Sequence, residues 1–228
     1  MGYPKLVVFM RHAESVGNVR TRDENIAAGI APHDYAITQR GVRQAVSSGK
    51  YLWDMFGDFD AHYVSTYPRT RQTLDASLIV PRGGVIKETS LLDEAQFGIY
   101  HYHSSQALNA LYPKERERQK HIGYYHYRPF GGENWADIEL RVRMLMMELE
   151  RDWSGKKVLL VGHGNLFAAF RRVIEGISTE EMLSMSGLNP ISNCGVAAYD
   201  GVGPWYTPWN KTRLVPLEIV IPWLADDF

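Results

Sequence analysis

Short runs of consecutive apolar residues alternate along the chain with longer segments in which apolar residues recur at every third or fourth position. The runs at Leu6–Met10 and Lys157–Val161 are typical of strands that are buried on both faces, as in a parallel sheet. Ala61–Val64 is a third, shorter run. Helical spacing is clearest in Thr38–Phe56 and Asn134–Arg151, where it predicts two amphipathic helices.

Four further elements follow from the same patterns. Helices are predicted at Arg69–Val80 and at Leu166–Glu175, and strands at Ile191–Tyr199 and Leu214–Ile221. Strands that alternate with helices in this way favour an α/β fold in which helices cover both faces of the sheet. We therefore predict a three-layer α/β/α architecture with a mostly parallel sheet.

Residues 98–132 differ from the rest of the chain. A helix is predicted at Ser104–Lys120, and the mixed charges of Lys114–Arg118 are typical of a solvated helix face. We interpret the segment as a cap inserted at one edge of the sheet, within a single domain of residues 1–228. Its aromatic side chains either line a pocket entrance that accepts an organic leaving group or cover the sheet edge. These side chains are Tyr100, Tyr102, Tyr124, Tyr125 and Tyr127.

Charge and composition exclude several classes of partner. The formal net charge of −1 gives no electrostatic reason to expect nucleic acid or an anionic membrane. No apolar run approaches the ~20 residues that a membrane span needs, and no secretory signal pattern is present. Cys194 is the single cysteine, which excludes an intramolecular disulfide and fits a reducing compartment. We predict a cytoplasmic protein, and nothing in the sequence indicates its oligomeric state.

Two of the predicted buried strands end in a histidine. Arg11 and His12 follow the first strand, His163 follows Lys157–Val161, and Arg69 comes soon after the strand between them. The carboxyl ends of parallel strands meet at one edge of a sheet, so these side chains can converge. A phosphoryl group carries about two negative charges, which arginines bind in bidentate fashion. A neutral imidazole can attack phosphorus, and fixed cations can replace magnesium.

Six segments match, in order, motifs of a known family. The first reads Arg-His-Ala-Glu and reaches Asn18, where the family has Arg-His-Gly-Glu-x-x-x-Asn. The chain thus resembles the histidine phosphatase, or phosphoglycerate mutase-like, superfamily over residues 5 to about 175. The matching segments are Arg11 to Asn18, Asp34 to Gly41, Ser65 to Thr73, Leu92 to Gly98, Gly131 to Asp137 and Val158 to Asn165.

The resemblance implies a role for each matching residue. His12 would be the nucleophile that forms phosphohistidine, and Glu94 would protonate the leaving oxygen and then activate water. Asn18 would add a neutral donor, and no metal or other cofactor is implied. The residues implied to bind the phosphoryl oxygens are Arg11, Arg69 and His163. Further substrate contacts are predicted at Thr38, Gly164 and Asn165.

Hydrolysis and mutase activity differ in the cations that they need. The family's phosphoglycerate mutases have a tyrosine where Phe97 stands, and a pair of adjacent arginines that the insertion here lacks. Asn165 after His163 and Gly164 is, in contrast, as in the mutases. We favour hydrolysis of a small phosphomonoester. The alternatives are a phosphoglycerate mutase-type phosphotransferase and a non-catalytic binding member of the superfamily.

The insertion is also rich in histidine, which raises the possibility of a metal site. The spacing of these histidines matches no standard zinc signature, so we predict no metal site. They are His101, His103, His121 and His126.

Overall fold

The computed structural model describes residues 2–79, 84–185, 191–200 and 218–221. Within these ranges a six-stranded sheet has the order β3-β2-β4-β1-β5-β6. Strands β1 to β4 are mutually parallel, whereas β5 runs antiparallel to both of its neighbours. The strands are β1 (Leu6–Arg11), β2 (Ala61–Val64), β3 (Val85–Glu88), β4 (Lys157–Gly162), β5 (Val196–Asp200) and β6 (Glu218–Val220).

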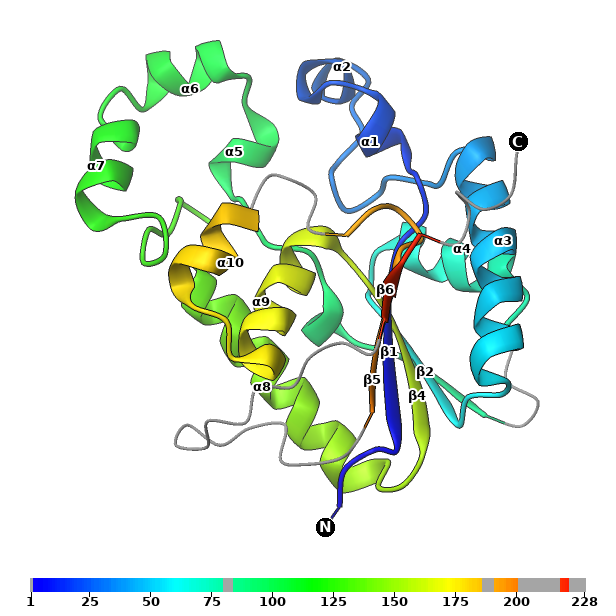
Figure 1. The fold of residues 1–228 in the computed structure, drawn as a ribbon. Helices are drawn as coiled ribbons and strands as arrows, with labels where there is room; N and C mark the ends of the chain where they lie inside the picture. The colour runs from blue at the N-terminus through cyan, green and yellow to red at the C-terminus, as the bar shows by residue number, and fades with distance from the viewer. Residues whose placement is uncertain (1, 80–83, 186–190, 201–217, 222–228) are drawn as a thin grey trace.

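Helices cover both faces of this sheet (Figure 1). On one side lie α3 (Gln39–Phe56) and α4 (Pro68–Ser77), and on the other lie α8 (Trp135–Asp152), α9 (Gly164–Glu175) and α10 (Thr179–Met185). Strand β1 shows why both layers form, because Val8 packs toward α3 and α4 while Phe9 packs toward α8 and α9. The predicted three-layer α/β/α fold is confirmed.

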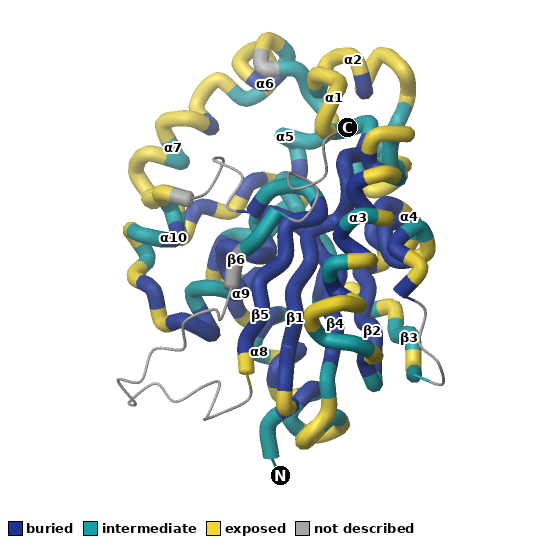
Figure 2. Tube along the Cα trace, turned by 45° about the vertical axis from the view of Figure 1, so that its right-hand side comes forward, coloured by how far each residue is buried: buried dark blue, intermediate teal, exposed yellow. Residues whose placement is uncertain are grey.

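The predicted insertion contains three short helices beyond the carboxyl ends of the strands (Figure 1). They are α5 (Ile99–Tyr102), α6 (Ser105–Leu111) and α7 (Glu115–Ile122). Figure 2 shows that α6 and α7 are largely exposed, whereas the central strands are buried. Two further short helices, α1 (Val16–Val19) and α2 (Arg22–Ala27), lie at the same end of the molecule.

Local chemistry explains where the helices begin and end. Thr38 caps α3 by accepting the Gly41 N–H at 3.0 Å, and α3 ends at Gly57, whose φ of 64° favours glycine. The single helix predicted at Ser104–Lys120 is wrong. The structure has α6 and α7 instead, with Pro113 between them, because proline lacks the N–H that a continuous helix needs.

Two other predicted boundaries also differ. The helix predicted at Arg69–Val80 ends at Ser77, because Leu78 adopts a left-handed conformation; Val80 lies outside the described residues. The strand predicted at Ile191–Tyr199 begins only at Val196, because Cys194 has a φ of 53° and residues 191–195 form a loop. Of the strand predicted at Leu214–Ile221, the described part is β6, and residues 214–217 lie outside the described residues.

Several short elements were not predicted. Strand β3 lies at the edge of the sheet and its residues are partly exposed, so its sequence shows no continuous apolar run. Helices α1, α2 and α5 each have at most six residues, too few for a periodic pattern. Over the described residues, no helix combines the length and the apolar character that a membrane crossing would require.

His62 of β2 is an unusual polar group in the core. Its side chain is fully buried on the α3 side of the sheet, next to the ring of Phe59 at 5.8 Å. Neither ring nitrogen has a hydrogen-bond partner among the described residues. Burial lowers the pKa of His62 from 6.5 to about 4, and nearby Asp58 opposes this shift. The imidazole is therefore neutral in the folded protein at neutral pH.

His62→Phe is expected to make the protein less sensitive to acid. Below pH 6.5 the unfolded chain protonates this histidine but the folded protein does not, so stability falls as the pH falls from 6.5 toward 4. At pH 5 this linkage costs about 2 kcal/mol. Relative to the wild type, the variant should therefore gain about that much unfolding free energy between pH 7.5 and pH 5. Urea titrations at the two pH values measure it.

The control is His121→Phe, which makes the same change at an exposed position on α7. If His62→Phe and wild type lose stability in parallel between the two pH values, the buried imidazole is not responsible for the acid sensitivity.

Candidate active site

The two histidines that end buried strands meet because β1 and β4 are parallel neighbours. Arg11 pairs with Gly162 in the register of the sheet, and the His12 N–H donates to the Gly162 carbonyl at 2.9 Å. The next residue on each strand is therefore a histidine at the same edge of the sheet. The ring centroids of His12 and His163 are 5.1 Å apart.

The hydrogen bonds of His12 fix its tautomer. Nδ1 lies 2.7 Å from the Ala13 carbonyl oxygen. A carbonyl oxygen only accepts, so Nδ1 carries the proton and Nε2 keeps its lone pair. The ring is buried, and this burial lowers its pKa well below 6.5, with further lowering by the charges of Arg69 and Arg11. His12 thus presents a neutral imidazole with a nucleophilic Nε2 at neutral pH.

His163 is fully buried, and both of its ring nitrogens contact protein groups. Nδ1 lies 3.0 Å from Arg69 Nη2, and Nε2 lies 2.7 Å from Ser65 Oγ. A guanidinium only donates, so Nδ1 accepts from Arg69 and the Nε2–H donates to Ser65. Burial, and then the charge of Arg69, lowers the pKa of His163 well below 6.5. The structure therefore uses neutral His163 to orient Arg69.

Two arginines supply fixed positive charge. Arg11 Nη1 donates to the Ile191 carbonyl at 2.8 Å, and Arg69 Nη1 donates to the Pro32 carbonyl at 2.9 Å. The guanidinium carbon of Arg69 also lies 4.7 Å from the ring centroid of Tyr67. Burial lowers the pKa of Arg69 to about 10, partly opposed by Glu94, so the side chain stays charged at neutral pH.

The carboxylate of Glu94 lies at the N-terminus of α9. Oε1 accepts the N–H groups of Ala95 at 2.9 Å and of Leu166 at 3.2 Å. Oε2 accepts the backbone and side-chain N–H groups of Asn165, both at 3.4 Å. Backbone N–H groups at a helix N-terminus lack partners within the helix, so they are free to hold this carboxyl group in place. The longer bonds leave Oε2 the less firmly held oxygen.

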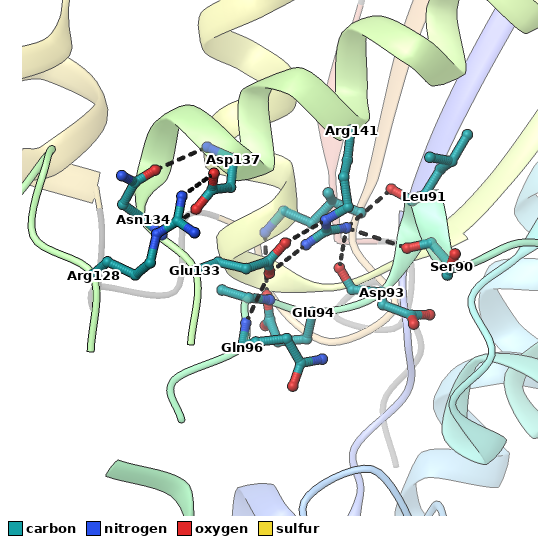
Figure 3. Close-up of polar contacts among 12 residues, drawn as sticks. Ser90, Leu91, Asp93, Glu94, Gln96, Arg128, Glu133, Asn134, Asp137 and Arg141 are labelled. Atoms are coloured by element: carbon teal, nitrogen blue, oxygen red, sulfur yellow. Dashed lines mark hydrogen bonds and ion pairs between the residues drawn. The ribbon is translucent and has the colours of Figure 1, made fainter. Parts of the chain in front are cut away.

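A network centred on Arg141 of α8 holds the loop that carries Glu94 (Figure 3). Arg141 Nη1 donates to the carbonyls of Ser90, Leu91 and Asp93 at 3.0–3.3 Å. Its Nε and Nη2 bind Glu133 at 2.7 and 2.9 Å, and Glu133 in turn accepts the Gln96 N–H at 3.0 Å. The loop is therefore tied on both sides of Glu94.

Arg11, His12, Arg69 and Glu94 line a cavity of about 270 Å³ at the carboxyl ends of the strands, which we call the phosphoryl pocket. Asn18 lines it, and its Oδ1 accepts hydrogen bonds from Ser15 N, Ser15 Oγ and Asn193 Nδ2. The amide nitrogen is thus the end of Asn18 that can donate to a bound anion. Further residues that line the pocket include Arg22, Tyr35, Tyr67, Phe97 and His101.

Residues 7–212 match the model of the histidine phosphatase superfamily, branch 1. The chain belongs to this superfamily. It is 30% identical over 185 residues to a 2,3-bisphosphoglycerate-dependent phosphoglycerate mutase of Methylobacterium radiotolerans. The matched region covers 78% of this chain and 82% of that protein. It is 27% identical to the fructose-2,6-bisphosphatase of Saccharomyces cerevisiae over 80% of this chain and 37% of that protein.

The fold is also similar to solved structures. The alpha-ribazole phosphatase from Shigella flexneri superposes with a TM-score of 0.68 at 18% sequence identity, over 88% of this chain and 92% of that chain. The relatives of this histidine phosphatase superfamily member thus include both mutases and phosphatases.

Three residues that were predicted to contact substrate make contacts with other protein groups in this superfamily member. Thr38 caps α3 and donates to Glu14 Oε1 at 2.7 Å. Gly164 packs against Arg11, where an added Cβ would lie 3.6 Å from the guanidinium carbon. Asn165 holds Glu94. None of the three, and not His163, is among the described residues that line the phosphoryl pocket. Their contact with substrate stays a prediction.

The loop at residues 191–195 holds Arg11 and the backbone of His12 in place, and the strand predicted over these residues gave no indication of this contact. Asn193 Nδ2 donates to the His12 carbonyl at 3.0 Å, and the Cys194 N–H donates to the Arg11 carbonyl at 3.1 Å. The Ile191 carbonyl accepts from the Arg11 guanidinium. A single Asn in a loop gives no signal in the sequence, so only the fold reveals this contact.

The positive side chains of the pocket are arginines, and metal ligands are not clustered around it. Within residues 2–79, 84–185, 191–200 and 218–221, no group of three or more His, Cys, Asp or Glu side chains is arranged to hold a metal ion. Buried arginines with fixed hydrogen bonds can bind phosphoryl oxygens in bidentate fashion.

Proposed function

We propose that the protein hydrolyses phosphomonoesters without a metal, through a phosphohistidine intermediate on His12. The observation that carries this proposal is the tautomer of His12. Its Nδ1–H donates to the Ala13 carbonyl, so Nε2 carries the lone pair that is available for attack. The ring lines the same pocket as Arg11 and Arg69. A neutral nucleophile beside two permanent cations suits attack on a dianionic phosphoryl group.

The proposed reaction has two transfers. In the first, the lone pair of His12 Nε2 forms a bond to phosphorus while the bond from phosphorus to the leaving oxygen breaks. Glu94, which must enter this step protonated, donates a proton from its less firmly held Oε2 to that oxygen, and the alcohol departs. In the second, a water oxygen attacks phosphorus, its proton passes to Glu94, and the phosphorus–nitrogen bond breaks to return the pair to Nε2. Arg11 and Arg69 balance the charge on the phosphoryl oxygens throughout.

Three contacts support hydrolysis over mutase activity. A mutase must also bind a second acidic group of its substrate. The arginines of the cap bind partners there instead: Arg118 pairs with Glu115, Arg128 pairs with Asp137, and Arg116 donates to Asn109. Phe97, without a hydroxyl, lines the phosphoryl pocket. Phosphoglycerate mutase activity is the second candidate, and the 30% identity to a mutase favours it.

The test is hydrolysis of p-nitrophenyl phosphate by the purified full-length chain with and without EDTA, alongside an assay of 3-phosphoglycerate isomerisation primed with 2,3-bisphosphoglycerate. We expect hydrolysis that EDTA leaves unchanged, competitive inhibition by vanadate, and isomerisation at least about tenfold slower than hydrolysis. Activity lost to the chelator would overturn the metal-free route. Faster isomerisation would favour the mutase.

A further inference from the structure

We propose that the substrate is a phosphomonoester of a bulky aromatic alcohol, whose ring system occupies a second cavity beside the phosphoryl pocket. This inference rests on the proposed function, because it names the leaving group of that reaction. The second cavity has a volume of about 400 Å³, and we call it the aromatic cavity. Six of its thirteen lining residues are Phe97, Tyr100, Tyr124, Tyr127, Pro129 and Trp135.

The aromatic cavity adjoins the phosphoryl pocket. Arg22, Phe97 and His101 line both. Glu94 lines the phosphoryl pocket, and its neighbour Ala95 lines the aromatic cavity. A leaving oxygen held near Glu94 therefore lies at the junction, and the group attached to it extends into the aromatic cavity.

Several polar groups of the aromatic cavity are already bound to other protein groups. Arg22 Nη1 donates to the Tyr100 carbonyl at 2.7 Å. The Tyr127 hydroxyl donates to Glu115 and lies 3.1 Å from the Tyr100 hydroxyl. Glu133 forms its ion pair with Arg141. His101 is neutral, because burial and the charge of Arg69 lower its pKa to about 4. Apart from Arg22, which lines both cavities, what these residues chiefly offer a ligand is ring faces and edges.

This lining distinguishes between classes of phosphomonoester. Aromatic rings pack against one another in offset or edge-to-face arrangements and gain from leaving water. Phosphoglycerate or a sugar bisphosphate would fill little of the aromatic cavity, and beyond Arg22 their second anionic group would meet mainly aromatic side chains there. A fused-ring alcohol would fill it, and burial of such a group corresponds to roughly 10- to 100-fold in affinity.

Two alkyl phosphates with similar leaving oxygens test this inference. Ethyl phosphate and 2-(2-naphthyl)ethyl phosphate differ chiefly in the ring system, which only the second can place in the aromatic cavity. We expect kcat/KM to be roughly 10- to 100-fold higher for the naphthyl ester, in line with the area of ring that is buried. Equal values for the two esters, or a preference for 3-phosphoglycerate over both, would overturn the inference.

A pair of variants on one helix locates the binding site. Gln119 of α7 lines the aromatic cavity, whereas Glu117 of the same helix is exposed and does not. Gln119→Trp should fill the cavity and reduce kcat/KM for the naphthyl ester about tenfold, since the ring's burial is lost, with ethyl phosphate unaffected. Glu117→Trp, the matched control, should change neither value. An equal reduction for both esters by Gln119→Trp would contradict the assignment.

Tyr124→Ala provides an independent test, because it removes a side chain from the cavity wall where Gln119→Trp adds a larger one. Tyr124 is 64% exposed at the cavity wall, so its removal should leave the fold intact. We expect kcat/KM to fall selectively for the naphthyl ester. The control is Tyr102→Ala, which changes an exposed tyrosine outside the cavity and should leave kcat/KM unchanged.

The proposed function and this inference fail in different ways. If neither ester nor p-nitrophenyl phosphate is hydrolysed by wild type, the proposed function fails. Hydrolysis without ring preference refutes only the aromatic leaving group.

Discussion

His12→Ala is expected to reduce phosphatase turnover by roughly 10⁴- to 10⁶-fold, the range typical of losing a covalent nucleophile. The reason is that the lone pair of Nε2, which the Ala13 carbonyl directs by holding Nδ1–H, lies in the pocket that contains Arg11 and Arg69. His163 cannot replace it, because its ring nitrogens bind Arg69 and Ser65. The measurement is kcat for p-nitrophenyl phosphate, with vanadate binding as a check that the pocket persists.

His126→Ala, at an exposed position of the cap, is the matched control and should retain wild-type turnover. A His12→Ala protein that binds vanadate and keeps more than a small fraction of wild-type kcat would show that another group attacks phosphorus.

Glu94→Gln is expected to slow hydrolysis of ethyl phosphate by about 10²- to 10⁴-fold, the range of general acid catalysis. A glutamine cannot protonate the leaving alkoxide, although its oxygen can still accept from Ala95 and Leu166 as Glu94 Oε1 does. The loss should be much smaller for p-nitrophenyl phosphate, whose phenolate leaves without a proton. The measurement is kcat for both esters with wild type and variant.

The two esters act as each other's control in this experiment. If Glu94→Gln slows both equally, the carboxylate positions the pocket or the helix terminus and does not protonate the leaving group.

The centre of the site was predictable because strands carry a simple signal. The apolar runs that become β1 and β4 end in His12 and His163, and parallel neighbours bring their carboxyl ends together. Arg69 follows β2, the next strand in the sheet. The pattern of apolar residues along the chain therefore indicates which distant residues meet.

The rest of the site depends on contacts that leave no pattern. The Asn193 amide that holds the His12 carbonyl lies in the loop just before β5. This loop is far from β1 in the sequence. Arg141 fixes the Glu94 loop from a helix whose apolar stripe predicts only its buried face. Thr38 and Asn165 belong to matching motifs, yet they hold Glu14 and Glu94. Motifs identify neighbours of a site without separating those that line it from those that support it.

The most direct test of the account is to trap the covalent intermediate. Wild-type protein mixed with p-nitrophenyl phosphate is quenched in base, which preserves phosphohistidine, and the modified peptide is located by mass spectrometry and the ring nitrogen by ³¹P NMR. The account predicts one phosphoryl group, on Nε2 of His12, because Nδ1 is held by the Ala13 carbonyl. A hydrolysing enzyme that carries no phosphoryl group, or carries it on another residue or on Nδ1, would contradict it.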